Sequence, residues 1–333
     1  MSFEMNRRNL VGGTAALMTA FGLNRFAFAQ DASPEATAVA NPVVTVTEGP
    51  GEDELTITHA QGETVIKKNP EKIVSFDVAS IQSIEFLGGT LAGVPEITGE
   101  DVYTSDAEIV GSLFEPDYEA INAMAPDLIL IAGRSAAAYP DLSNIAPTVD
   151  ITFADGMVES FSNISRFLGT IVGNEQGAED AIAEVETRVA ALQEATADAG
   201  TAMMLMASAG SITALAPGNA RGGRGALIYN VLGMLPPVED LETATHGEPI
   251  SFEFLLEHNP DWLFVIDRDV AVGSEEGAQP AEELFDNDIV KETTAYQNDQ
   301  IVYVNPFDWY IITGAGIPSF DRMLTEIETA FGI

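Results

Sequence analysis

The sequence predicts an α/β protein of two related, Rossmann-like α/β lobes joined by a single long α-helix, with a ligand cleft between the lobes. Two observations support this prediction. One motif occurs twice, at residues 118–134 and 252–268, and each copy contains an apolar run typical of a buried strand. Between the copies, residues 176–197 have the apolar periodicity of one long amphipathic helix.

The repeated motif predicts the same helix–strand unit in both lobes. YEAINAMAPDLILIAGR and FEFLLEHNPDWLFVIDR align without a gap, and each residue of the second copy follows its counterpart by 134 positions. Pro-Asp ends the amphipathic segment, because proline clashes with the preceding helical turn. The apolar run that follows lacks alternation, which suits a parallel strand with helices on both faces of its sheet. A chance coincidence of two Pro-Asp strand starts is the alternative.

The N-terminus is predicted to be a twin-arginine signal peptide, which implies export to the periplasm. Asn6-Arg7-Arg8 precedes an apolar stretch, and Ala27-Phe28-Ala29 supplies the small residues that a signal peptidase requires. A membrane anchor is the alternative, but Asn24 and Arg25 interrupt a run already shorter than the roughly 20 apolar residues that span a bilayer. The chain has no cysteine, which excludes disulfides, thiolate metal sites and a lipoprotein anchor. We expect no membrane insertion of the mature chain.

Composition excludes one class of partner. The chain has 14 Lys and Arg against 52 Asp and Glu, a net charge of −38. Nucleic acid is excluded, because phosphate contacts need clustered cations. The sequence is nevertheless 46% hydrophobic, which indicates a protein with a substantial core. Adaptation to saline surroundings is one hypothesis for the acidity.

The pattern of strands, helices and breaks divides the chain into five segments. The stretch that follows the signal peptide lacks periodicity and is rich in Ala, Pro, Thr, Glu and Gly, which is typical of disorder. The predicted organisation is a signal peptide at 1–29, a disordered tether at 30–54, an N-terminal α/β lobe at 55–172, a linker helix at 173–198 and a C-terminal α/β lobe at 199–333.

Each lobe is predicted to combine its repeat copy with flanking strands and helices. In the N-terminal lobe we expect a hairpin of 55–58 and 64–67, strands at 73–76, 91–94 and 148–151, and helices at 79–87, 139–143 and 157–172. In the C-terminal lobe we expect strands at 203–207, 212–215 and 300–304, and helices at 225–231 and 317–331.

Arginines are the most conspicuous candidates for ligand binding. Arg134 and Arg268 follow the two repeat strands, and open α/β sheets bind ligands at the carboxyl ends of their strands. The glycine-rich loop 217–225 contains Arg221 and Arg224 and precedes a helix, so its N–H groups and arginines suit an anion. For each arginine, a solvated or ion-paired side chain is the alternative.

The histidines carry weaker signals. His59, in a hairpin turn, and His258 are expected at the surface. His246 lies in a loop before the second repeat helix, where a solvated side chain and a ligand contact are both open. No His, Asp or Glu stands at zinc-ligand spacing from His246. Because the sequence also has no nucleophile elbow and no HExxH, we expect a protein that is not an enzyme.

Several blocks of sequence resemble one family. They include Lys68-Asn69-Pro70-Glu71-Lys72-Ile73-Val74, Asn144-Ile145-Ala146-Pro147-Thr148, Thr245-His246-Gly247, Ile250-Ser251-Phe252-Glu253, Asp286-Asn287-Asp288-Ile289-Val290 and Trp309-Tyr310. Over residues 55 to 333 the chain is similar to the class III periplasmic substrate-binding proteins of ABC iron-siderophore importers. The likeness is greatest to the ferric-catecholate branch of enterochelin or petrobactin type.

The resemblance implies a function and a set of partners. It implies an extracytoplasmic protein, expected to be a monomer, that captures a ferric siderophore and delivers it to the permease of an ABC importer. It implies no intrinsic cofactor, because the ferric iron is carried by the siderophore. The alternatives are a binding protein of the same fold for haem or cobalamin, and a hydrolase that processes siderophores.

The resemblance also implies roles for individual residues. Arg134, Arg224 and Arg268 correspond to the arginines that bind the anionic ligand, with Arg221 as an alternative to Arg224. His246 and Tyr310 correspond to the residues that complete the coordination of the siderophore's iron. Glu119 and Glu253, with Glu115 as a substitute for Glu119, correspond to the carboxylates that dock onto the permease. Trp309 is expected beside the cleft.

Overall fold

The computed structural model describes residues 44–97, 106–153, 156–217, 224–239, 241, 247–273, 279–312 and 316–333. All of them belong to one compact unit, Ala40–Ile333. Within these ranges, no helix is both long and apolar enough to cross a membrane. The predicted signal peptide at 1–29, and the predicted tether up to residue 43, lie outside them.

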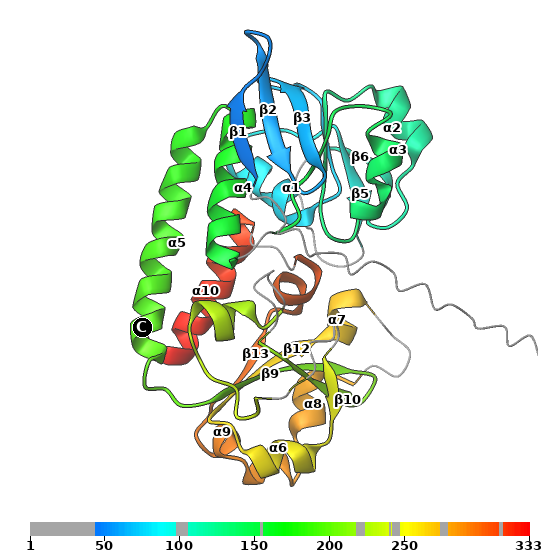
Figure 1. Cartoon of the computed structure of the whole chain (residues 1–333). Helices are drawn as coiled ribbons and strands as arrows, with labels where there is room; N and C mark the ends of the chain where they lie inside the picture. The colour runs from blue at the N-terminus through cyan, green and yellow to red at the C-terminus, as the bar shows by residue number, and fades with distance from the viewer. Residues whose placement is uncertain are drawn as a thin grey trace, which may run out of the picture. The chain divides into compact units, whose positions relative to one another are not determined.

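The N-terminal lobe, which lies at the top of Figure 1, contains a parallel five-stranded sheet of order β6-β5-β4-β7-β8. Its strands are β4 (Ile73–Ser75), β5 (Gly93–Glu96), β6 (Glu108–Ser112), β7 (Leu128–Ile131) and β8 (Thr148–Asp150). The first repeat strand, β7, lies inside the sheet: Ile129 and Ile131 pack into one apolar cluster, and Leu128 and Leu130 into another on the opposite face. This arrangement explains why the run lacks alternation.

A second sheet of three antiparallel strands adjoins this lobe. It contains β1 (Thr45–Glu48), β2 (Glu54–His59) and β3 (Gly62–Lys67), so the predicted hairpin is confirmed. The prediction of a disordered tether up to residue 54 is wrong for its last part. Val44 is buried, and β1 pairs with β2 over four residues. Valine and threonine alternate from Val44 to Thr47, and such β-branched residues favour a strand.

The C-terminal lobe contains a five-stranded sheet of order β11-β10-β9-β12-β13. Its strands are β9 (Ala202–Ser208), β10 (Ser211–Leu215), β11 (Glu248–Ile250), β12 (Trp262–Asp267) and β13 (Ile301–Val304). The second repeat strand, β12, pairs in parallel with β9 and β13, whereas β10 and β11 are antiparallel to their neighbours. β12 thus has a strand on each side, as β7 has in the other sheet.

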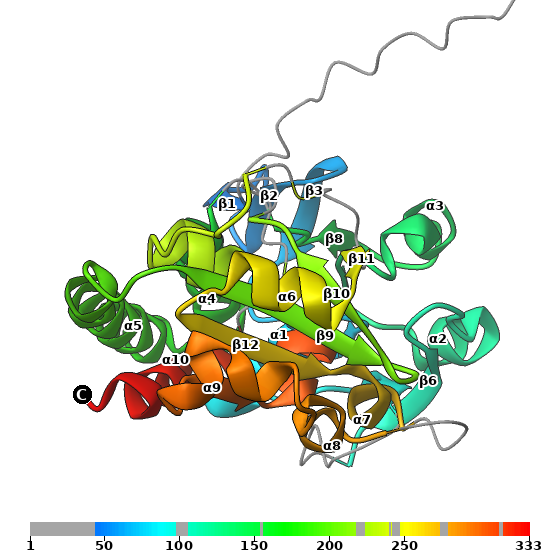
Figure 2. The same ribbon diagram turned by 90° about the horizontal axis from the view of Figure 1, so that it is seen from below.

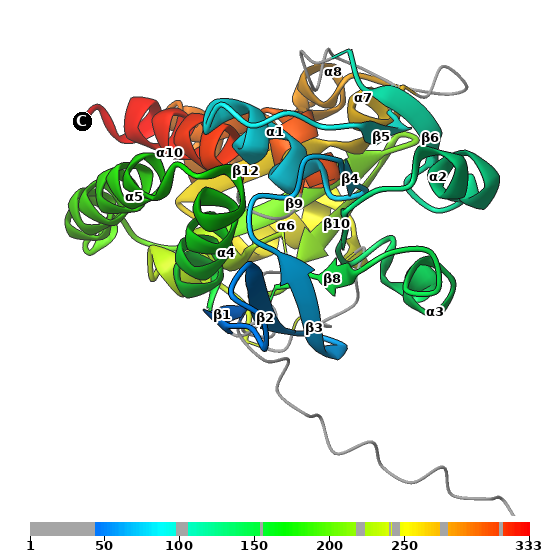
Figure 3. The same ribbon diagram turned by 90° about the horizontal axis from the view of Figure 1, so that it is seen from above.

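Helices cover both faces of each large sheet. The helices are α1 (Val78–Phe86), α2 (Tyr118–Met124), α3 (Tyr139–Leu142), α4 (Met157–Val172), α5 (Glu175–Thr196), α6 (Phe252–His258), α7 (Arg268–Val272), α8 (Ala281–Phe285), α9 (Thr294–Gln297) and α10 (Ile317–Phe331), with 3-10 turns η1 (Ala136–Ala138) and η3 (Val290–Glu292) and π-helical turns η2 (Leu227–Val231) and η4 (Phe307–Ile312). Figure 3 shows α2 and α3 on one side of the N-lobe strands and α1 and α4 on the other. Figure 2 shows α6, α8 and α9 against one face of the C-lobe sheet, with α10 behind it.

The long helix α5 connects the two lobes. Before it, the Asn174 side chain donates to the Leu87 carbonyl at the end of α1. At its other end, the Thr196 hydroxyl donates to the carbonyl of Leu232, just after η2. Its buried stripe, from Ala178 to Leu192, belongs to an apolar cluster that includes residues of both large sheets. The fold is therefore two α/β lobes joined by one long helix, as predicted.

The repeated motif forms the same local structure in both lobes. α2 and α6 each have seven residues, and each ends at a left-handed residue, Ala125 (φ 50°) or Asn259 (φ 42°). The carboxylate of Asp127 then accepts hydrogen bonds from backbone N–H groups before β4. Asp261 accepts one from Thr201 N before β9. Each Pro-Asp pair thus ends a helix and aligns its strand with the neighbouring one.

Candidate functional site

The two repeat arginines follow their strands, but different parts of the chain hold them. Arg134 lies three residues after β7, and Arg268 is the first residue of α7, directly after β12. Arg134 crosses to the other lobe, where it donates to the carbonyl oxygens of Ile311 (2.6 Å) and Tyr310 (2.8 Å). Arg268 donates through Nε to the Tyr310 hydroxyl (2.9 Å). Both arginines therefore meet at η4.

Tyr310 is the residue around which three arginines gather. Its side chain is only 6% exposed. The guanidinium carbon of Arg224 lies 4.3 Å from the centre of the Tyr310 ring, and that of Arg268 lies 5.6 Å from it. A guanidinium group over an aromatic face is attracted by the negative face of the ring quadrupole. The sequence-predicted residues Arg134, Arg224, Arg268 and Tyr310 thus lie together at one place between the lobes.

Burial makes this group of cations electrostatically costly. It lowers the pKa of Arg134, although Tyr310 and Asp77 act in the opposite direction. It also lowers the pKa of Arg224; Tyr310 opposes that shift, and the positive charges of Arg134 and Arg268 add to it. Guanidinium stays charged in proteins, so three like charges remain close together in a half-buried place. A bound anion would relieve their repulsion and replace lost water.

One carboxyl group on the N-terminal lobe also acts on this cluster. Asp77 caps α1, because its carboxylate accepts hydrogen bonds from the N–H and hydroxyl of Ser80. Burial raises the pKa of Asp77, whereas the bonds from Ser80 and the charge of Arg134 lower it. Asp77 was not predicted to be part of the site. Its position two residues after the first strand of the lobe's large sheet, β4, was the available signal.

Polar groups of its own lobe also contact Arg268. Its Nη1 donates to the Ser208 hydroxyl (3.2 Å) and lies 3.8 Å from a carboxylate oxygen of Asp269. The Ser208 hydroxyl and the backbone N–H of Ala209 in turn donate to Asp269, at 2.9 and 2.6 Å. Neither Ser208 nor Asp269 was predicted, because their role depends on β9 lying beside β12.

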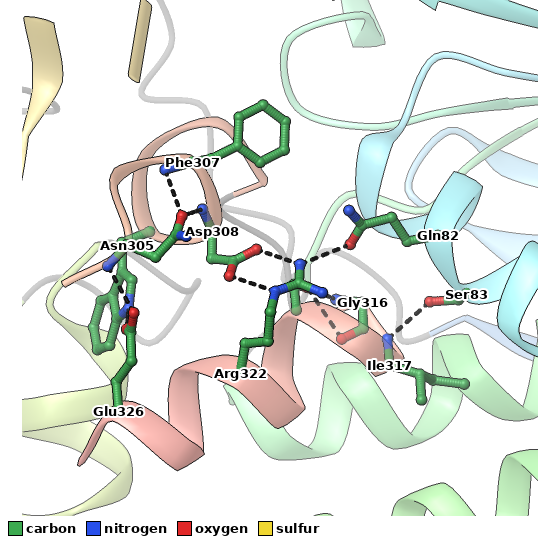
Figure 4. A network of polar contacts seen from close by, with 11 residues as sticks. Gln82, Ser83, Asn305, Phe307, Asp308, Gly316, Ile317, Arg322 and Glu326 are labelled. Carbon is green, nitrogen blue, oxygen red and sulfur yellow. Dashed lines mark hydrogen bonds and ion pairs between the residues drawn. The ribbon is translucent and has the colours of Figure 1, made fainter. Parts of the chain in front are cut away.

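The turn η4 that carries Tyr310 is anchored on both sides. Asp308 is 1% exposed and accepts hydrogen bonds from Arg322 of α10 at 2.6 and 2.8 Å. Arg322 also reaches the Gln82 side chain on α1 (Figure 4). A few residues away, the N–H of Ile317 donates to the buried Ser83 hydroxyl (Figure 4). The same network that supports Tyr310 thus joins η4 and α10 to a helix of the N-terminal lobe.

Trp309 was predicted to lie beside the cleft, but it does not lie beside the arginine cluster. It is 1% exposed, belongs to the main apolar cluster and donates from its indole N–H to Glu326 of α10 (2.7 Å). Consecutive residues of a helical turn point in different directions, so Tyr310 reaches the arginines while Trp309 enters the core.

The predicted docking carboxylates occupy equivalent positions. Glu119 and Glu253 are the second residues of α2 and α6, both are exposed, and each helix is capped by the side chain before it. Backbone and Ser251 hydrogen bonds lower the pKa of Glu253. Glu115, the substitute for Glu119, is also exposed. Each lobe therefore presents one of the two predicted docking carboxylates.

Two predicted ligand residues, His246 and Arg221, lie outside the described residues. The prediction that His59 is a surface residue is wrong: its side chain is fully buried. His258 is half-buried and packs on Phe254. Of the residues that the structure describes, no three His, Cys, Asp or Glu gather into a group that could hold a metal ion.

The sequence and the fold match known proteins. Residues 73–306 match the family described as periplasmic binding protein. The petrobactin-binding protein YclQ of Bacillus subtilis is 30% identical over 83% of this chain and 88% of its own. A crystal structure of a TroA-like periplasmic binding protein from Xylanimonas cellulosilytica has 42% identity and a TM-score of 0.75, covering 81% of this chain and 92% of that one. The catecholate-siderophore binding protein VctP of Vibrio cholerae has 32% identity and a TM-score of 0.75, covering 83% and 99%.

Proposed function

Because the chain belongs to the periplasmic binding protein family, we propose that it captures an anionic ferric siderophore of the catecholate class outside the cytoplasm. It then delivers this ligand to the permease of an ABC importer. One observation carries the choice of ligand: three arginines converge on Tyr310 in a chain whose net charge is −38. Three cations at one half-buried place suit a ligand with several negative oxygens.

The names of similar proteins support this ligand class. YclQ is described as binding petrobactin, and VctP as binding catecholate siderophores. A ferric catecholate combines anionic oxygens with aromatic rings. A guanidinium can donate hydrogen bonds in its plane to the oxygens and can stack its face on the rings.

The remaining roles are part of the proposal. Tyr310 and His246 complete the coordination of the iron when the siderophore leaves positions open, since phenolate and imidazole are suitable ligands. Glu119 and Glu253 dock the loaded protein onto the permease. The twin-arginine segment directs export to the periplasm, where the protein acts as a monomeric carrier without catalytic activity.

A titration with matched variants tests the ligand class. Wild type, Arg134→Ala and Arg268→Ala are titrated with a ferric bis-catecholate, a ferric tris-catecholate, ferric citrate, haem and cobalamin. Losing one charge-assisted contact costs roughly 1.5–3 kcal/mol, so each variant should bind the ferric catecholates about ten- to a hundredfold more weakly. Arg166→Ala is the control, because Arg166 pairs with Glu179 between α4 and α5. Tight binding of haem or cobalamin instead, or two arginine variants that bind like wild type, would refute the proposal.

A further inference from the structure

The two repeat arginines differ in what orients them. The position equivalent to Asp269 in the first copy is Ser135, 134 residues earlier. The Ser135 hydroxyl bonds to the backbone of Ala132 in its own turn, so the residue that follows Arg134 supplies no carboxylate to it. Arg134 is held by carbonyl oxygens of η4 in the other lobe. Arg268 is held by Ser208, Asp269 and Tyr310, all in its own lobe.

The hydrogen bonds around Ser208 have a fixed direction. A guanidinium only donates and a carboxylate only accepts. Because Ser208 has one hydroxyl proton, it must donate that proton to Asp269 and accept from Arg268 Nη1. Asp269 is 4% exposed and also receives the N–H of Ala209, a non-glycine residue at φ 49° in the β9–β10 turn. These hydrogen bonds thus connect the tight turn to Arg268 through Asp269 and Ser208. Arg268 in turn donates from Nε to the Tyr310 hydroxyl.

From this geometry we infer that Ser208 and Asp269 are positioning residues that fix the Arg268 guanidinium against Tyr310 before any ligand arrives. The C-terminal lobe therefore presents a preorganised half of the site, whereas Arg134 adopts its position only when the lobes meet. Preorganisation removes the entropy cost of ordering a long side chain on binding. This inference deepens the proposed function and rests on it for the identity of the ligand.

A measurement without ligand tests the positioning itself. In the ¹⁵N-labelled full-length mature protein, the Arg268 Nε–H signal is identified by its loss in Arg268→Lys. Ser208→Ala should make this proton exchange with water at least about threefold faster, because Nη1 loses its acceptor. Ser208→Thr, which keeps a hydroxyl, should restore wild-type exchange. Ser211→Ala is the matched control, an exposed serine at the other end of the same turn. Unchanged exchange in Ser208→Ala would overturn the inference.

A double-mutant cycle then tests the consequence for binding. With a ferric bis-catecholate as the probe, Ser208→Ala should raise the dissociation constant roughly three- to tenfold, and Ser208→Thr should restore it. In the Arg268→Ala background the same substitution should change it less than about 1.5-fold, because Ser208 acts only through Arg268. An equal loss in both backgrounds, or no loss in either, would overturn the role in binding.

The two measurements separate this inference from the proposed function. If the wild-type protein binds none of the ferric siderophores, the proposed function fails, but the exchange rate of the Arg268 Nε–H still decides whether Ser208 positions that side chain. If binding occurs and Ser208→Ala leaves both the exchange rate and the affinity unchanged, the inference fails and the proposed function stands. Asp269→Asn provides a second variant. It should also speed exchange, because a neutral amide accepts more weakly than a carboxylate.

Discussion

Acid should destabilise this protein through the buried His59. Its Nδ1 accepts hydrogen bonds from the backbone N–H groups of Asp150 (3.2 Å) and Gln61 (3.3 Å). Its Nε2 lies 2.8 Å from the Thr64 hydroxyl. Because Nδ1 accepts two hydrogen bonds, the ring is neutral with its proton on Nε2. Protonating Nδ1 would turn this acceptor into a donor that faces two backbone donors. Consistent with this, burial lowers the pKa of His59 below 6.5, although the charge of Asp150 acts in the opposite direction.

The direction and size of the effect follow from this pKa. In the unfolded chain, His59 takes up a proton as the pH falls through 6.5, but in the folded protein it does so only at lower pH. The stabilisation is thus fully present above pH 6.5 and is lost as the pH falls below it. One such proton lowers the free energy of unfolding by at most about 1.4 kcal/mol between pH 7.5 and 5.5.

Denaturant unfolding at pH 7.5 and 5.5 measures this loss. His59→Gln should be less stable than wild type at pH 7.5, by about 1–3 kcal/mol, because the Nδ1 acceptor of two backbone N–H groups is lost. Between pH 7.5 and 5.5, the free energy of unfolding should also fall less in His59→Gln than in wild type, by up to about 1.4 kcal/mol. His258→Gln is the control, since the His258 Nδ1 donates to the Phe254 carbonyl. If His59→Gln shows the same pH dependence as wild type, the reasoning is wrong.

Three further predictions address transport, coordination and packing. Glu119→Ala and Glu253→Ala should reduce ferric-siderophore uptake by cells while leaving the dissociation constant unchanged; a large loss of affinity would place these carboxylates in the ligand site instead. Tyr310→Phe should remove a phenolate-to-iron absorption band and weaken a tetradentate ferric siderophore more than a hexadentate one; equal losses would exclude coordination. Gly316→Ala should lower the free energy of unfolding by about 1–3 kcal/mol in denaturant melts, because the added Cβ would lie 2.6 Å from the Ala79 carbonyl oxygen; wild-type stability would show that α1 and α10 can separate.

The parts of the fold that depend on local pattern were predictable. Pro-Asp ended both repeat helices, and the apolar runs became β7 and β12, each between two other strands of its sheet. The arginines after those strands followed from the polarity of a parallel sheet. These features repeat within one chain, so each copy supported the interpretation of the other.

Features that depend on neighbours far along the chain were not predictable. His59 was expected at the surface because a polar residue in a turn usually is, but it is buried and accepts a hydrogen bond from the backbone N–H of Asp150. The first strand, β1, was missed for a different reason: it is only four residues long, although its partner β2 is the next strand along the chain. Ser208 became part of the site only because Asp269 lies beside the end of β9. For His59 and Ser208 the deciding contact joins residues that are far apart in the sequence.

The contacts of Arg134 also bear on which ligands the site prefers. Its guanidinium donates to the carbonyl oxygens of Tyr310 and Ile311, and these two bonds use only two of its five N–H groups. A neutral oxygen of a ligand would add one more hydrogen bond of the kind that these carbonyls already accept. An anionic oxygen adds the attraction of a full negative charge, which is strong where burial has removed water. The same oxygen also reduces the repulsion that Arg134 and Arg268 exert on Arg224. The arrangement therefore discriminates by charge before it discriminates by shape.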